Sequence, residues 1–238
     1  MPQPGDFLSL EDELNLYLVT HGQKPAAMLF IYAKGELAEK KTEAWLWITK
    51  ERIQFRKDVV SSFHKVLDNA GVSHYGQLRT YGKTYFWAGI IPVKKETSEY
   101  YDICIGKDKK SLEKLVTAKT DHEKGMALGY PEAAVHAFCC VIDGERRDGN
   151  YFYVSLAKAK QAGIELPAWL AYLSFVPENM DLIGGNVSPT SEALGKEYQA
   201  FVRKNNPSLA EQVEQKFSAT LLPQKWTLRS DGHYKYVK

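Results

Sequence analysis

The sequence has few cysteines, no strong excess of charge and no long apolar run, and each shortage excludes a class of protein. Three cysteines among 238 residues, two of them adjacent, do not form the even set of a secreted disulfide scaffold. The formal net charge of +2 is far below that of a dedicated duplex-DNA binder. No apolar stretch approaches the roughly 20 residues that cross a bilayer, and the first residues lack the pattern of a signal peptide. We therefore expect a soluble, cytoplasmic protein with no membrane partner.

The sequence also lacks the local motifs of common nucleotide-binding and hydrolytic enzymes. It contains no G-x-x-x-x-G-K-[ST] loop, no G-x-G-x-x-G after a strand, no H-E-x-x-H and no G-x-S-x-G. Because no complete catalytic constellation is visible, whether the chain is an enzyme stays open, and we expect no cofactor and no metal.

What the chain does have is apolar content for a sizeable core, 44% of the residues, and 14 tyrosines. Helical spacing occurs in both halves, whereas β-branched and aromatic stretches concentrate in the first half and at the end. This pattern, without regular strand–helix alternation, predicts a mixed, helix-rich α+β fold with a small N-terminal sheet and a C-terminal hairpin. We expect one compact unit, 1–238, whose lobes would be 1–118 (α+β) and 119–238 (mainly helical), because the charged stretch 117–124 is the best boundary.

Individual elements follow from apolar spacing and from capping residues. Helices are predicted over 9–22, 54–70, 107–118, 151–162, 188–205 and 207–218, with a further helix from Pro131. Strands are predicted at Tyr81, 84–91 and 100–105. The segment 26–32 is a strand or a short buried helix, 35–41 a solvated link, 43–48 of either type, and 166–177 short and buried. His64 is placed in a helix and His74 in a loop, both as structural residues.

The helix that starts at Pro131 carries the first candidate site. Glu132, His136 and Cys140 fall close to one stripe of this helix. The opposite, core-facing side would consist of Ala134, Val135, Phe138, Val141 and Ile142. A carboxylate, an imidazole and a thiol could ligate a metal or perform acid–base catalysis, although all three could not hold one ion across some 12 Å. A solvated Glu132–His136 pair beside a small, half-buried cysteine explains the same residues.

Two other segments carry titratable or glycine-rich patterns before a helix. Asp121-His122-Glu123 is either a polar site or simply a helix start in a charged stretch. Gly184 and Gly185, followed by Ser188 and Pro189, form a loop whose free N–H groups could bind an anion at the helix N-terminus. A loop that ends in a capping serine explains this pattern equally well.

The last segment, 226–237, predicts a hairpin around Asp231-Gly232, with Trp226 opposite Val237 and Leu228 opposite Lys235. Tyrosines alternate there with basic residues, namely Lys225, Arg229, His233, Lys235 and Lys238. Rings that stack on bases and cations that contact phosphates are typical of single-stranded nucleic-acid binding. A solvated edge hairpin that uses lysines to avoid aggregation is the alternative.

The stretch Leu128-Gly129-Tyr130-Pro131-Glu132, continuing into Val135 and Phe138, resembles the LGYP-x-CC-V-x-x-F signature of a prokaryotic family labelled domain of unknown function 483. The segment Gly22-Gln23-Lys24-Pro25-Ala26-Ala27 also resembles that family. The family's P-C-S-x-x-C segment would correspond to 176–181, leading into the helix at 188–196.

This chain departs from the family pattern at the cysteines. Ala133 and Ala134 stand at the paired positions, 176–181 contains no cysteine, and 181–187 looks like an insertion. Four thiolates would form a natural zinc or iron–sulfur site. The resemblance therefore implies a member that has lost this site.

Three functional hypotheses remain. The first is a binding or vestigial member of that uncharacterised family, with an unknown small molecule or protein as partner. The second is an enzyme with a cleft beside the Pro131 helix, where His136 would act as acid or base, Glu132 as its partner and Cys140 as a thiol. The third is single-stranded nucleic-acid binding through the C-terminal hairpin, which the residues do not favour over the first.

Overall fold

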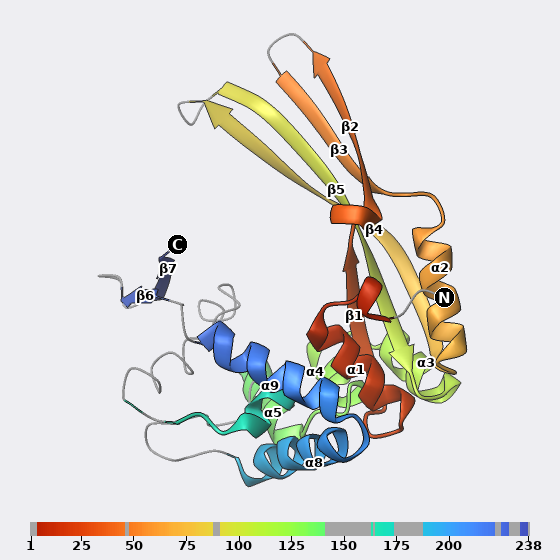
Figure 1. The fold of residues 1–238 in the computed structure, drawn as a ribbon, viewed down its shortest axis with the longest axis vertical. Helices are drawn as coiled ribbons and strands as arrows, with labels where there is room; N and C mark the ends of the chain where they lie inside the picture. The colour runs from red at the N-terminus through yellow and green to blue at the C-terminus, as the bar shows by residue number, and fades with distance from the viewer. Residues whose placement is uncertain are drawn as a thin grey trace. The chain divides into compact units, whose positions relative to one another are not determined.

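The chain folds as two compact units, Met1–Thr117 and Ala118–Lys238. The computed structural model describes residues 4–45, 48–87, 91–140, 163, 165–173, 188–221, 225–228 and 234–237. The predicted α+β class is confirmed, with a mixed sheet in the first unit and mainly helices in the second (Figure 1). Within these ranges, no helix is long and apolar enough to cross a bilayer.

The first unit combines helices with a mixed five-stranded sheet. Its helices are α1 (Leu10–Thr20), α2 (Val59–Asn69) and α3 (Lys109–Thr117), with 3-10 turns η1 (Pro4–Asp6) and η2 (Gly35–Leu37). Its strands are β1 (Ala26–Tyr32), β2 (Ala38–Trp45), β3 (Ile48–Phe55), β4 (Ser73–Trp87) and β5 (Ile91–Gly106).

Strand β5 organises this sheet because its two halves have different neighbours. On one side, β4 pairs with β5 antiparallel, from Ser73 opposite Gly106 to Trp87 opposite Ile91. On the other side, 100–106 pairs antiparallel with β1, whereas 94–98 pairs parallel with β3, which in turn pairs with β2. We call the part built on 100–106 and β1 the proximal sheet, and the part built on 91–98, β2 and β3 the distal sheet. The distal strands extend away from the helices of this unit (Figure 1).

The hydrophobic core lies on one face of the proximal sheet. Alternate residues of a strand point to the same face, and Tyr101, Ile103 and Ile105 of β5 are all buried. Their partners on β1 are the buried residues Ala27, Leu29 and Ile31. The helices complete the cluster with Leu16 and Val19 of α1 and Phe63, Val66 and Leu67 of α2.

Helix α1 begins where its cap was predicted, whereas α2 begins later than predicted. The Ser9 hydroxyl accepts a hydrogen bond from the Asp12 N–H. This bond caps the first turn of α1, which therefore begins at Leu10. Phe55 stays in β3, where its N–H donates to Glu99 Oε2 at 2.9 Å. The chain then turns through Asp58, whose φ of 71° is left-handed. The predicted helix start at 54 is therefore wrong.

The predicted solvated link at 35–41 is also wrong, because it contains η2 and the start of β2. Strands β4 and β5 are longer than predicted, and His74 lies in β4 rather than in a loop. The residues of β2 that have a described exposure are half-buried or exposed. Since no face of such a strand enters a core, its sequence carries no apolar alternation from which to predict it.

The second unit contains α4 (Asp121–Ala127), α5 (Glu132–Cys140), η3 (Ala168–Tyr172), α8 (Pro189–Asn205), α9 (Pro207–Leu221), β6 (Lys225–Leu228) and β7 (Tyr234–Val237). Helices α8 and α9 confirm their predictions, with Ser188 at the N-cap and Pro189 in the first turn. The predicted helix over 151–162 lies outside the described residues.

One carboxylate links three elements of this unit. Glu214 of α9 accepts hydrogen bonds from the Tyr172 hydroxyl of η3 at 2.7 Å and from Arg203 Nε of α8 at 2.9 Å. Gln199 of α8 donates to the same oxygen at 3.1 Å. The Arg203 bond is the main cause that lowers the pKa of Glu214 to about 2. Because its partners fully occupy it, we assign this cluster to stability.

Candidate functional site

The stripe predicted on α5 lies at the surface of the second unit. Glu132 and His136 are exposed, and nothing is described for the Cys140 side chain. Ala134 and Val135 are buried as predicted, but the expected core residue Phe138 is 49% exposed. The buried contact involves the first turn, where Gly125 of α4 approaches so closely that a Cβ there would lie 2.7 Å from Val135 Cγ2. Phe138, one turn further on, is beyond this approach.

The structure describes only some of the other candidate residues predicted from the sequence. Asp121-His122-Glu123 is the first turn of α4, where Thr120 and Glu123 form a reciprocal capping box. Ser188 makes no capping side-chain bond, and Gly184 and Gly185 lie outside the described residues. In the described part of the chain, no three His, Cys, Asp or Glu side chains gather as a metal site.

The C-terminal hairpin forms, but its predicted register is wrong by one residue. Trp226 is opposite Tyr236, and Leu228 is opposite Tyr234. This pairing leaves five residues between the strands rather than an even number. The predicted turn at Asp231-Gly232 lies outside the described residues.

A surface that the sequence did not single out lies on the first unit, on the sheet face opposite the core. Strand register places Tyr32 of β1 and Tyr100 of β5 side by side on this face, with Tyr81 of β4 one diagonal position away. The rings of Tyr32 and Tyr100 are stacked, with their centroids 5.9 Å apart and their planes inclined by 25°. The ring centroids of Tyr81 and Tyr100 are 6.1 Å apart. Tyr85 also lies on this face, with Lys94 Nζ 5.2 Å from its ring centroid.

We call this surface the tyrosine face and define it by Tyr32, Tyr81, Tyr85, Tyr100, Arg79, Lys83 and Lys94. The rings of Tyr32, Tyr81 and Tyr85 belong to residues that are 40–43% exposed. Aromatic rings that touch one another at the surface, rather than in a core, are typical of contact sites.

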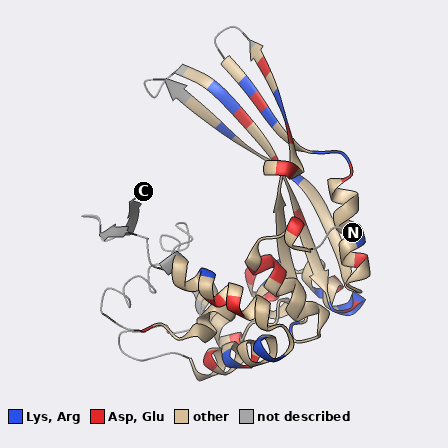
Figure 2. Ribbon diagram, in the orientation of Figure 1, with Lys and Arg blue, Asp and Glu red and all other residues tan. Residues whose placement is uncertain are grey.

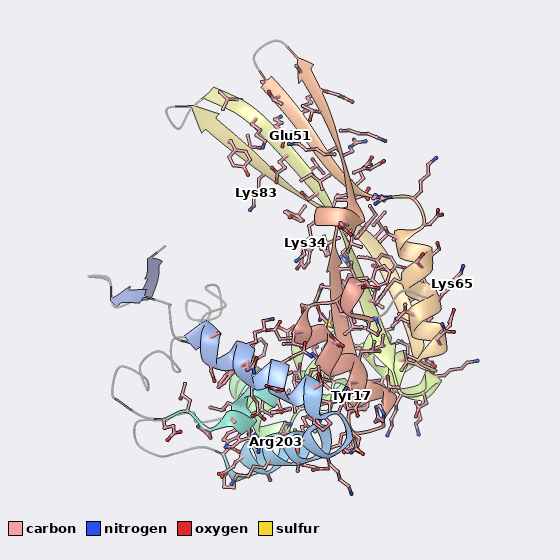
Figure 3. The ribbon with its side chains drawn as sticks, in the orientation of Figure 1. Tyr17, Lys34, Glu51, Lys65, Lys83 and Arg203 are labelled. Atoms are coloured by element: carbon pink, nitrogen blue, oxygen red, sulfur yellow. The ribbon has the colours of Figure 1, made fainter. Side chains whose placement is uncertain are left out.

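The charged residues of this face are layered, with cations more exposed than the acids that bind them. Arg79 Nε lies 3.2 Å from Asp102 Oδ2, and the two side chains are 50% and 17% exposed. Lys40 and Lys94 both bind Glu51, at 2.9 and 2.7 Å, and Glu51 is 13% exposed. Charges of both signs mark the distal strands in Figure 2, and Figure 3 labels Glu51 and Lys83 there. The acids therefore hold the cations in place while the cations meet the solvent.

A signal for this face exists in the sequence of β4. Arg79, Tyr81, Lys83 and Tyr85 stand at every second position, which places a basic and an aromatic side chain alternately on one face of a strand. The interpretation of 84–91 and Tyr81 as separate strands hid this alternation, because the four residues were not assigned to one element.

The tyrosine face has a carboxylate, Asp12, near Tyr32 of β1, whereas β4 contributes the cations Arg79 and Lys83. Burial raises the pKa of the Tyr32 hydroxyl, and the nearby Asp12 carboxylate raises it further, with smaller effects from Tyr100, Tyr81 and Asp102. An anionic group of a ligand is therefore favoured near Arg79 and Lys83 of β4, away from Asp12.

A hydrogen-bonded chain crosses the opposite, core-facing side of the sheet. His64 Nε2 lies 2.8 Å from the Tyr101 hydroxyl, and His64 Nδ1 lies 2.8 Å from His74 Nε2. With Tyr101 donating to His64, His64 donating to His74, and His74 facing the Val72 carbonyl at 3.4 Å, each group of the chain has a partner while both imidazoles are neutral. Burial and the neighbouring His74 lower the pKa of His64, which favours this neutral state.

Lys24, directly before β1, is the other unusual titratable group. It is buried, and its ammonium donates to Asn15 Oδ1 at 2.7 Å. Burial lowers its pKa to about 7. Nothing in the local sequence predicts this burial, because Lys24 stands between polar and turn-forming residues.

No protein-family model, curated protein or solved structure was found to match this chain.

Proposed function

We propose that this chain acts by binding, and that the tyrosine face of the first unit is its ligand-contact surface. The observation that carries the proposal is a cluster of three rings from three neighbouring strands, in which Tyr100 contacts both Tyr32 and Tyr81 and these two outer rings are solvent-exposed. Placing such rings at the surface gains nothing for the core, whereas it provides apolar area and polar hydroxyls to a ligand.

We further propose that the resemblance to the family with the LGYP-x-CC signature reflects a relative that functions without the thiolate site. Ala134 is buried and Ala133 is exposed on α5, so small apolar side chains simply occupy the positions of the paired cysteines. Binding through a different unit would be compatible with that loss.

The test is a fluorine NMR spectrum of the full chain with 3-fluorotyrosine incorporated, titrated with chemically distinct probes. The probes are an oligothymidine, a linear glucose oligomer, a proline-rich peptide and ATP, each up to about 1 mM, the weak end of specific affinity. Tyr→Phe variants assign the resonances of Tyr32, Tyr81 and Tyr100. The buried Tyr172 of the second unit is the internal reference.

We expect at least one probe to shift the three assigned resonances while that of Tyr172 stays in place. The proposal is overturned if no probe moves them. It is equally overturned if the purified protein shows turnover that His136→Ala or Glu132→Ala abolishes, because the function would then belong to α5.

A further inference from the structure

We infer that the ligand of the tyrosine face is a single-stranded nucleic acid; this inference rests on the proposed function. Two rings and one guanidinium form a row across the sheet, since Tyr32, Tyr100 and Arg79 are consecutive partners in the register of β1, β5 and β4. Tyr81 adds a third ring beside this row. Successive bases of an unpaired strand can stack on such rings without regard to sequence, because every base has a flat π face.

The distribution of charge fits a polyanion whose backbone follows β4. Arg79, Tyr81, Lys83 and Tyr85 share one face at every second position, so that like side chains recur about every four residues, or roughly 13 Å. Cations there would contact phosphates while the rings between them contact bases. The acidic Asp12 lies at the other end of the face, beside Tyr32.

Arg79 is held in a fixed position for such a contact. Its Nε binds Asp102, and its Nη2 donates to Gln77 Oε1 at 3.0 Å. Gln77 in turn donates to the Tyr75 hydroxyl at 2.7 Å, so three residues of β4 on the same face brace one another. A guanidinium that is already ordered loses less freedom when it binds a phosphate.

A single strand fits better than a duplex, since the bases of a duplex already stack on one another and turn only their edges outward. A polymer without charge, such as a glucan, could stack on the rings but would offer no anionic group to the exposed cations. Because the cations are partly neutralised by Glu51, Glu96 and Asp102, stacking should contribute more than charge.

The experiment measures fluorescence anisotropy of labelled oligothymidine and oligouridine of about 12 nucleotides, and of a duplex of equal length, with the full chain. We expect both single strands to bind more tightly than the duplex. The logarithm of affinity should fall with the logarithm of salt concentration with a slope of about −0.7 to −2, for one to three phosphate contacts.

Matched variants locate the contact. Tyr100→Ala should weaken binding by about tenfold or more, whereas Tyr100→Phe, which keeps the ring, should bind like the parent chain. Lys83→Gln should make the salt slope shallower by about 0.7. Leu78→Ala is the control, because Leu78 is exposed on the opposite face of the same strand. Circular dichroism and thermal unfolding verify that each variant is folded.

Failure of the inference can be told apart from failure of the proposed function. If another probe shifts the tyrosine resonances while neither single strand binds, or if the duplex binds more tightly, the ligand class is wrong and the binding surface stands. If a single strand binds equally well to Tyr100→Ala and Tyr32→Ala but is lost on Trp226→Ala, both are wrong. The contact would then belong to the C-terminal hairpin.

Discussion

The proximal and distal parts of the sheet share β4 and β5 but are stabilised by different interactions. In the proximal sheet, alternate residues are buried under α1 and α2, and each large apolar side chain contributes about 1.5–3 kcal/mol. In the distal sheet, ion pairs between neighbouring strands replace that core, since Lys40 and Lys94 both bind Glu51. Such surface pairs contribute little to stability, typically below about 1 kcal/mol. The buried face of the proximal sheet therefore supports the strands, and the tyrosine face, which continues from the proximal onto the distal sheet, is left to serve a ligand.

The largest expected contrast is between a core ring and a surface ring. Phe63→Ala should lower the free energy of unfolding by about 3–5 kcal/mol, because Phe63 is fully buried in the proximal core. Tyr81→Ala on the distal part should lower it by less than about 1 kcal/mol. Urea unfolding followed by circular dichroism measures both. If the two units unfold separately, the transition that Phe63→Ala shifts is the one to compare, and equal losses would contradict the comparison.

Titration of the buried Lys24 should affect the stability of the fold above pH 7. The folded-state pKa of Lys24 is about 7, below the unfolded value, so the unfolded chain binds more protons between pH 7 and the unfolded pKa. The free energy of unfolding should therefore rise with pH above 7, by up to about 1.4 kcal/mol per pH unit. Denaturant unfolding at pH 7, 8 and 9 measures this slope.

The control is Lys24→Met, which should remove the rise. Lys83→Met, an equal change at an exposed distal position, should leave it intact. A flat profile in the parent chain, or a rise that survives in Lys24→Met, would show that Lys24 is not the group responsible.

Two glycines of β4 give a smaller, matched contrast. A Cβ on Gly76 would lie 2.7 Å from two ring carbons and the hydroxyl oxygen of Tyr101, which is packed in the proximal core and hydrogen-bonded to His64. Gly76→Ala should therefore cost about 1–3 kcal/mol by overpacking. Gly82→Ala, on the distal part of the same strand, meets its nearest atom at 3.6 Å and should be neutral or slightly stabilising. Thermal unfolding of the two variants would contradict the comparison if their order were reversed.

The same contrast explains which elements the sequence could predict. The end of β5 and helices α1, α8 and α9 carry caps or apolar spacing that follow from burial, whereas the apolar run of β1 predicts burial but fits a strand or a short helix equally. Strand β2 carries charges of both signs, and none of its residues with a described exposure is buried, so the pattern of 35–41 predicts a solvated link. Phe55 has helical spacing to Val59, yet its N–H bond to Glu99 keeps it in β3. Strand pairing and contacts far along the chain determine the structure of β2 and of Phe55, and the local sequence pattern does not encode them.

The candidate site was predictable only in part for a related reason. The alternation of Arg79, Tyr81, Lys83 and Tyr85 can be found by period two once 73–87 is treated as one strand. That Tyr32 and Tyr100 lie beside it depends on β1 and β4 both pairing with β5. Tyr32 is 68 residues from Tyr100 and 49 residues from Tyr81 along the chain, so no local pattern brings these rings together. The stripe of Glu132, His136 and Cys140 was easier to find, because a helix brings residues four apart together locally.

The smallest expected effect on stability comes from a charge change that should instead alter binding. Hydrogen bonds from Lys94 and Lys40 lower the pKa of Glu51, so this carboxylate is ionised at neutral pH and neutralises cations of the tyrosine face. Glu51→Gln should leave the unfolding midpoint unchanged. It should tighten oligothymidine binding and steepen the salt slope by about 0.7 for each lysine that becomes free to contact phosphate.

Glu39→Gln is the matched control, because Glu39 lies one position from Lys40 on β2 and hence on the opposite face. Equal tightening in both variants would mean that net charge, not the tyrosine face, attracts the strand; a lower unfolding midpoint in Glu51→Gln would mean that the distal surface also stabilises the fold.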